Sequence, residues 1–325
     1  MLKNRGRSGG AGVEMLPELV VHSDWSTAPA KRWMATARLR DGVYRVEPPE
    51  PVRRPETLLE SLACDADGGG LFVGFDFPIG LPRAYARRAG IVDFRGALPA
   101  FGSGTWNRFY DPAERAEEIA LERPFYPARP GGTRQAHLVA GLGVASMDDL
   151  LRDCERGGGD RRRACSLFWT LGGNQVGRAA IAGWRQVLVP AGERMGTELG
   201  MWPFEGDLQA LLATRACVVA ETYPSDACVQ LGLRAPGRGW SKRDTAGRRE
   251  QGRRLLEWAA DRPIDLCAVR GRVEDGFGTA AAGEDPFDAW VGLLGMLAVL
   301  LGLQPEGDPG DREARHVEGW ILGRC

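Results

Sequence analysis

The chain has 325 residues, of which 43% are hydrophobic, so it can bury a large core as one large domain or two ordinary ones. Lys+Arg number 42 and Asp+Glu number 43, and this balance argues against binding to nucleic acid or membrane through net charge alone. Seven cysteines without a Cys-x-x-Cys pair, beside only three histidines, argue against a zinc site of ordinary spacing. The scattered cysteines suit a reducing compartment, so we expect a cytoplasmic protein.

Two segments bear on targeting and membrane insertion. Residues 1–14 are rich in glycine and basic residues and lack an apolar core, so we expect a flexible tail and not a signal peptide. The longest apolar run spans 289–303 and is shorter than the roughly 20 residues that a membrane span needs. We therefore expect a buried helix there and no membrane partner.

The first quarter of the chain predicts three strands, a helix and a further strand. The run "ELVVHSDWS" at 18–26 reads as a strand that ends in polar residues, and "RDG" at 40–42 predicts a hairpin between the next two strands. The segment 55–66 has apolar residues at helical spacing, with Pro55 near its first turn. The near-continuous apolar run "LFVGFDFPIGLP" at 71–82 is typical of a central strand.

The middle of the chain has a different composition. Residues 83–214 are rich in Gly, Pro and Arg and predict a long, mainly helical insertion or subdomain. The flanking segments 15–82 and 215–325 would then form one core that the insertion interrupts.

Regular patterns return after the predicted insertion. The segment "ACVVAETYP" at 216–224 predicts a short buried strand. A charged helix follows at 241–261, with Ser241 as its expected cap, and the last long helix covers 284–303. Strands that alternate with helices after an opening meander predict an α/β fold with a layered sheet.

Five acidic side chains fall where an α/β sheet binds its ligands. Asp24, Asp76 and Glu221 lie at or near the C-terminal ends of predicted strands, the edge at which open α/β sheets bind ligands. Asp285 and Asp288 lie three apart at a helix start, so both face the same side. Clustered carboxylates repel one another unless a cation lies between them. Because oxygen-only sites suit Mg²⁺ or Mn²⁺, a metal site is predicted.

Most of these acids also have a structural interpretation. Asp24 could cap a turn, and Asp285 before Pro286 makes a good helix start on its own. Glu221 could face solvent at a strand end. Asp76 is hardest to explain in this way, because burying a lone carboxylate within an apolar strand costs several kcal/mol of folding free energy unless it is paired or bound.

The motifs "HSDWS", "VGFDFPIGLP", "ETYP" and "EDPFDAW" resemble those of the DUF429 proteins, which are predicted nucleases with an RNase H-like fold. The resemblance covers roughly residues 18–82 and 215–323 and leaves the middle segment unaccounted for. It implies an RNase H-like mixed sheet flanked by helices and a metal-dependent hydrolysis of phosphodiester bonds in DNA or RNA. The implied catalytic residues are Asp24, Asp76, Glu221, Asp285 and Asp288, and the implied ligands of Mg²⁺ or Mn²⁺ are Asp24, Asp76, Asp285 and Asp288.

One position departs from a related pattern. The pair Asp285 and Asp288 also looks like the last helix of Holliday-junction resolvases. Those enzymes carry a glutamate on the central strand, whereas this chain has Asp76, which shortens the reach toward a metal by one methylene.

Four basic residues are candidates for holding a substrate phosphate. Lysine occurs only three times in the chain, so Lys31 and Lys242 stand out near the predicted acids. Arg248 and Arg249 lie on the penultimate helix, where they could contact a nucleic-acid backbone. Arginine is abundant throughout the chain, so a solvated helix face is the alternative.

Two other functions remain open from the sequence. Actin-like kinases and ATPases share this fold core, but "DWSTAPAK" lacks the Gly-rich turn that they usually carry after the first strand. A non-catalytic protein-interaction module would use the same acids structurally, and it would be indifferent to Mn²⁺.

Overall fold

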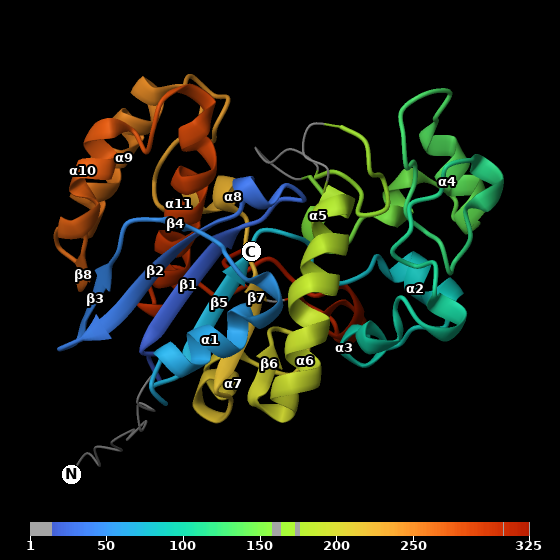
Figure 1. Ribbon diagram of the computed structural model, residues 1–325, viewed down its shortest axis with the longest axis horizontal. Helices are drawn as coiled ribbons and strands as arrows, with labels where there is room; N and C mark the ends of the chain where they lie inside the picture. Colours follow the sequence, from blue (N-terminus) through green and yellow to red (C-terminus); the bar gives the residue numbers. More distant parts are fainter. Residues whose placement is uncertain (1–14, 158–163, 173–175, 308, 325) are drawn as a thin grey trace, which may run out of the picture.

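The computed structural model describes residues 15–157, 164–172, 176–307 and 309–324 (Figure 1). The tail predicted at 1–14 lies outside this part of the chain. The centre of the described structure is a mixed sheet whose strands run in the order β6-β7-β5-β1-β2-β3-β8, with β4 beside β2. The strands are β1 (Leu19–Asp24), β2 (Trp33–Arg40), β3 (Val43–Val46), β4 (Glu50–Pro51), β5 (Leu71–Phe75), β6 (Leu199–Met201), β7 (Cys217–Glu221) and β8 (Ile264–Asp265).

The sheet joins an antiparallel half to a parallel half. Strands β1, β2 and β3 form the predicted meander, with a tight turn at Asp41 and Gly42 where the "RDG" signal lies. Strand β5 pairs parallel to β1 on one side and to β7 on the other, and β6 extends the parallel half beyond β7. The α/β class with a mixed sheet flanked by helices is therefore confirmed.

Eleven α-helices of the described residues cover the two faces of the sheet. They are α1 (Leu58–Asp65), α2 (Arg83–Ala89), α3 (Phe94–Ala97), α4 (Gln135–Leu142), α5 (Val176–Gly183), α6 (Val189–Met195), α7 (Leu208–Thr214), α8 (Pro224–Gln230), α9 (Thr245–Ala259), α10 (Arg270–Asp275) and α11 (Glu284–Leu300). None of the helices in the described ranges is long and apolar enough to cross a membrane.

Alternation along β1 assigns its side chains to two separate cores. Leu19 and Val21 pack with α1 and with the helices of the 83–214 segment on one face. Val20 packs on the other face, where α11 lies across the sheet beside α8 (Figure 1). Because side chains alternate along a strand, His22 and Asp24 point toward the α11 face.

The segment 83–214 shares its core with the sheet. Its buried aromatic side chains Phe94, Phe109 and Trp184 belong to the same cluster as Val21 and Phe75 of the central strands. It also supplies β6, an edge strand of the sheet. Its other elements are short helices and 3-10 turns, and α2, α4 and α5 lie beyond the parallel half of the sheet (Figure 1). This segment is therefore packed against the core through a continuous apolar layer.

Two local predictions were wrong in detail. Helix α9 begins at Thr245, and its cap is Asp244, whose side chain accepts hydrogen bonds from the backbone N–H groups of Ala246 and Gly247. Ser241, the expected cap, lies before it. Pro55 lies in a 3-10 turn, and the α-helix that follows begins only at Leu58.

Candidate active site

Two of the predicted acids lie side by side at the carboxyl ends of the central strands. Asp24 is the last residue of β1, and Asp76 follows the last residue of β5. The two strands are parallel neighbours with Ser23 opposite Phe75. The backbone N–H of Asp76 donates to the Ser23 carbonyl at 3.4 Å, so the pairing continues to the point where the carboxylates emerge.

Helix α11 brings a third acid to the same place. Asp288 lies in its second turn, and Gly292 lies one turn further on the same side of the helix. A Cβ atom on Gly292 would stand 2.2 Å from Nε2 of His22, so only glycine allows α11 to approach β1 this closely. His22 is fully buried, and the close approach places Asp288 over the end of the strand that carries Asp24.

The three acids and Asp285 line one cleft of about 450 Å³. Burial raises the pKa of Asp24 well above its ordinary value, and the charges of Asp76, Asp288 and Asp285 raise it further. Burial also raises the pKa of Asp76 to about 7, although the Trp25 backbone N–H donates to its Oδ1 at 2.6 Å and opposes the shift. The cleft therefore holds more buried negative charge than its surroundings neutralise.

Lys242 neutralises one of these carboxylates. Its Nζ lies 2.7 Å from Oδ1 of Asp288 and also donates to Ser225 Oγ at 3.3 Å. Burial lowers the pKa of Lys242, yet the negative charge of Asp288 outweighs burial and keeps the pKa of Lys242 above its ordinary value. Burial raises the pKa of Asp288 in turn, while Lys242 pulls it down. Lys242 is thus a fixed counter-charge on one side of the acid cluster.

The second lysine, Lys31, lies at the cleft in a different state. Its side chain is exposed and belongs to the cleft lining. Burial raises the pKa of Asp285, and the nearby charge of Lys31 opposes that rise. In the described part of the chain Lys31 has no ion-pair partner within 4.0 Å, so it can meet a bound anion, as can Arg243, whose side chain is 75% exposed at the same cleft.

Glu221 is bound by an arginine that the sequence did not single out. Arg152, from the 83–214 segment, donates from Nη1 and Nη2 to the two carboxylate oxygens of Glu221, both at 2.6 Å. The Ile79 backbone N–H donates to the same carboxylate at 2.7 Å. Burial raises the pKa of Glu221, and Arg152 opposes the shift. Glu221 reaches the cleft, but its oxygens are already satisfied within the protein.

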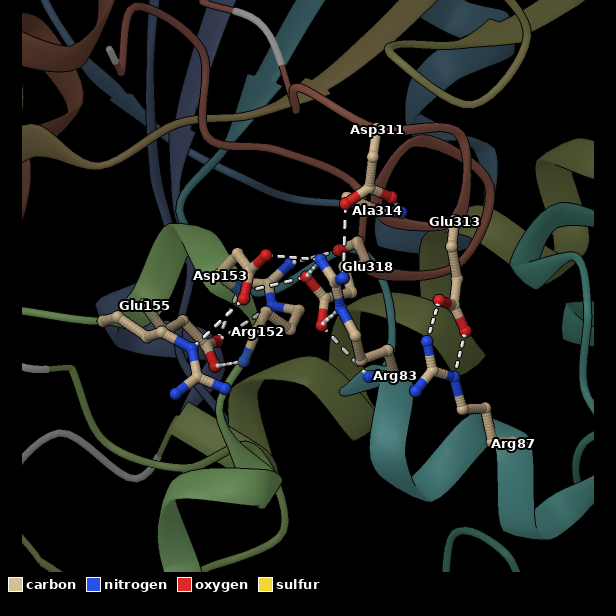
Figure 2. Close-up of polar contacts among 10 residues, drawn as sticks. Arg83, Arg87, Arg152, Asp153, Glu155, Asp311, Glu313, Ala314 and Glu318 are labelled. Atoms are coloured by element: carbon tan, nitrogen blue, oxygen red, sulfur yellow. Dashed lines mark hydrogen bonds and ion pairs between the residues drawn. The ribbon is translucent and has the colours of Figure 1, made fainter.

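Arg152 belongs to a larger ionic network beneath the cleft (Figure 2). It also donates to Glu155 at 2.9 Å and to the backbone carbonyls of Ile79 and Glu318. Arg83 binds Glu318 and Asp153 close by. The network joins the loop after β5, the end of β7, the 83–214 segment and the C-terminal segment.

The two arginines predicted as phosphate contacts lie elsewhere. Arg248 is fully buried, and its guanidinium donates to the backbone carbonyls of Lys242, Gly276 and Gly278. It fixes the loop that carries Lys242 and offers no free donor face to a substrate. Arg249 is exposed on α9 but does not line the cleft.

Sequence reasoning missed several residues of the cleft and its surroundings. Tyr223 and Arg324 line it, and Asp226 pairs with Arg324 at 2.6 Å. Tyr223 lies within the "ETYP" motif, so its place after a strand end was an available signal. Arg152 and Arg324 had no such signal, because arginine is common along the whole chain.

The donor set has the chemistry of a hard divalent-cation site. Asp24, Asp76 and Asp288 offer only carboxylate oxygens, which suit Mg²⁺ or Mn²⁺. Within the described ranges, no group of three or more His, Cys, Asp or Glu side chains is arranged to hold a metal ion. As arranged, Asp24 and Asp76 face each other while Asp288 is held by Lys242.

No family model matches the chain, and comparisons with curated proteins and with solved structures likewise found no match.

Proposed function

We propose that the protein is a divalent-cation-dependent phosphodiester hydrolase with an RNase H-like core. One observation carries this proposal: Asp24, Asp76 and Asp288, from three separate elements, meet in one cleft with raised pKa values. Buried acids that repel one another destabilise a fold and are characteristic of sites that bind cations or transfer protons. Either role supports hydrolysis, and the oxygen-only donor set favours a cation.

The topology supports the RNase H-like part of the proposal. An antiparallel meander of β1, β2 and β3 continues into the parallel strands β5 and β7. Asp24 ends β1, Asp76 follows β5, and Asp285 and Asp288 lie in the first two turns of the last long helix. This arrangement fits the fold that the resemblance to DUF429 proteins implies.

Asp24 and Asp76 would hold the cation, with Asp288 as the third ligand on the helix side. A cation held there would activate a water molecule and stabilise the leaving oxygen of a phosphodiester. In this proposal Lys242 sets the position and charge of Asp288 before a cation binds. Lys31 would bind a phosphate oxygen at the mouth of the cleft.

The proposal assigns Glu221 a supporting role. Its carboxylate is held by Arg152 and by the Ile79 N–H, so it stabilises the cleft wall and does not serve as a metal ligand. Asp285 is half-buried beside Lys31, where it would adjust the charge at the entrance.

The test is a calorimetric titration of Mn²⁺ at pH 7.5 into the wild type, Asp24→Asn and Asp288→Asn. Asp24→Asn removes a ligand and should abolish binding, whereas Asp288→Asn should weaken it by roughly tenfold or more. Hydrolysis of bis(p-nitrophenyl) phosphate with Mn²⁺ should fall by roughly 100-fold in Asp24→Asn.

A matched control is Asp67→Asn. Asp67 is exposed in the turn before β5 and has a positive φ of 46°, which asparagine tolerates well. It should bind Mn²⁺ as the wild type does. Absence of Mn²⁺ binding at millimolar metal in the wild type would refute the proposal and favour a protein-interaction module.

A further inference from the structure

The cleft has the dimensions of a small-molecule site. Its volume of about 450 Å³ lies at the lower end of the range of roughly 300–1,000 Å³ that ligand pockets occupy. The acids line it together with Cys165, Val176 and Ala179 of the 83–214 segment, which form the facing wall. A phosphodiester bond must therefore enter between two walls to reach Asp24, whose side chain is almost fully buried.

The charges around the cleft do not suit a duplex. Interfaces with double-stranded DNA bury about 1,000–2,500 Å² of protein surface and are strongly positive. Here most basic residues of the lining are paired within the protein: Arg152 with Glu221, Lys242 with Asp288, and Arg324 with Asp226. Arg243 lies 3.5 Å from Glu284. Within the described ranges, Lys31 and the mostly exposed Arg243 are left to meet the charge of one or two phosphates.

Two aromatic residues line this cleft, Trp25 and Tyr223, and Trp25 is buried. All tryptophans, tyrosines and phenylalanines of the chain lie in the described ranges, and among them Tyr223 alone is exposed, at 38%. It lies two residues beyond the end of β7 and lines the cleft with the acids. The aromatic residues of the 83–214 segment are buried or half-buried in the core.

Neighbouring groups restrain Tyr223. The Arg324 guanidinium lies 6.0 Å from its ring centroid, and Arg324 is itself fixed by Asp226 at 2.6 Å. Pro224 restrains the backbone on its C-terminal side. A rigid, exposed ring beside a phosphate site is a stacking platform for a nucleobase, because every base offers a π face.

We propose that the cleft takes a substrate of one or two nucleotides, with a base stacked on Tyr223 and a phosphate at Lys31, and not a nucleic-acid duplex. This inference rests on the proposed hydrolase function for the cleaved bond, and its binding part can be tested without turnover.

The experiment measures Mn²⁺-dependent hydrolysis of a dinucleotide, of a 20-base-pair duplex and of bis(p-nitrophenyl) phosphate by the full chain. We expect kcat/KM to be highest for the dinucleotide and at least roughly tenfold lower for the duplex. Tyr223→Leu should raise KM for the dinucleotide by roughly tenfold, and by less for the diester that has no base. Tyr223→Phe keeps the ring and should preserve the wild-type KM.

Binding of a nucleoside 5′-monophosphate, followed by calorimetry, separates the two proposals. Loss of binding in Tyr223→Leu but not in Val229→Ala, an exposed residue of α8 that is not part of the cleft lining, would support the inference even if no diester is hydrolysed. Faster cleavage of the duplex than of the dinucleotide would overturn it. Equal nucleotide binding by the wild type and Tyr223→Leu would overturn it as well.

Discussion

At the scale of single residues, the acid cluster works against the stability of the fold. Asp24 is buried and Asp76 beside it is half-buried, and the raised pKa of each means that the folded state favours the protonated carboxyl. A raised pKa in an acid means that the folded state binds more protons than the unfolded state. The cluster therefore favours the folded state at low pH and opposes it as pH rises.

The sign and the range of this effect can be predicted. Burial in the folded protein raises the pKa of Asp76 from its ordinary value near 3.8 to about 7. Without metal, the free energy of unfolding should therefore fall as pH rises between about 4 and 7. At pH 8 in EDTA, Asp24→Asn should be more stable than the wild type by about 1 kcal/mol. Urea denaturation at several pH values measures both.

The comparison of the two proteins at each pH isolates the cluster, because the exposed carboxylates are the same in both. Asp67→Asn should follow the wild type throughout. A difference between wild type and Asp24→Asn that does not grow with pH would contradict the assignment. Saturating Mn²⁺ should stabilise the wild type and leave Asp24→Asn unchanged, because only the intact cluster would hold the cation.

At the scale of elements, the sequence predicted the strands and helices that carry the acids. Apolar runs that stop at polar residues located β1, β5 and β7, and the long apolar run at 289–303 located α11. The four acids therefore line one cleft as expected, because the position of each follows from the end of a strand or the start of a helix. They are Asp24, Asp76, Asp285 and Asp288. The 83–214 segment was less predictable, since its short helices and 3-10 turns take their form from the shared core.

The contact between α11 and β1 gives a sharp test at this scale. Gly292→Ala places a methyl group against the buried ring of His22 and should destabilise the protein by about 1–3 kcal/mol or more. It should also weaken Mn²⁺ binding, because Asp288 lies one turn away on the same helix. Chemical denaturation and calorimetry measure the two effects.

Gly271→Ala is the matched control for this substitution. Gly271 lies in α10, and a Cβ atom there would meet nothing within 4 Å. Because alanine restricts the unfolded chain more than glycine, Gly271→Ala should be neutral or stabilising by about 0.4–1 kcal/mol. Equal losses in Gly271→Ala and Gly292→Ala would show that helix propensity, and not the close approach to His22, sets the cost.

At the scale of the whole molecule, contacts between side chains far apart in the sequence decide the roles of residues that the motifs could not predict. Glu221 was placed correctly at a strand end, but its partner Arg152 lies 69 residues away in a segment that no motif covers. Nothing in the spacing of either residue indicates the pair. Arg248 was misassigned for a similar reason, because burial among backbone carbonyls depends on the α9–α10 packing and not on helix periodicity.

The Arg152 network predicts how firmly the 83–214 segment is docked. Arg152→Met should cost about 3–5 kcal/mol of unfolding free energy, because Glu221 and Glu155 would remain buried without their counter-charge. Adding Glu221→Gln should recover part of the loss. Arg156→Met, which breaks a half-exposed pair with Asp153, should cost less than about 1 kcal/mol.

Urea denaturation measures these losses, and amide hydrogen exchange should show the 83–214 segment opening before the central strands in Arg152→Met. Uniform loss of protection across the sheet would mean that the network stabilises the core alone and does not dock the segment that forms the facing wall of the cleft.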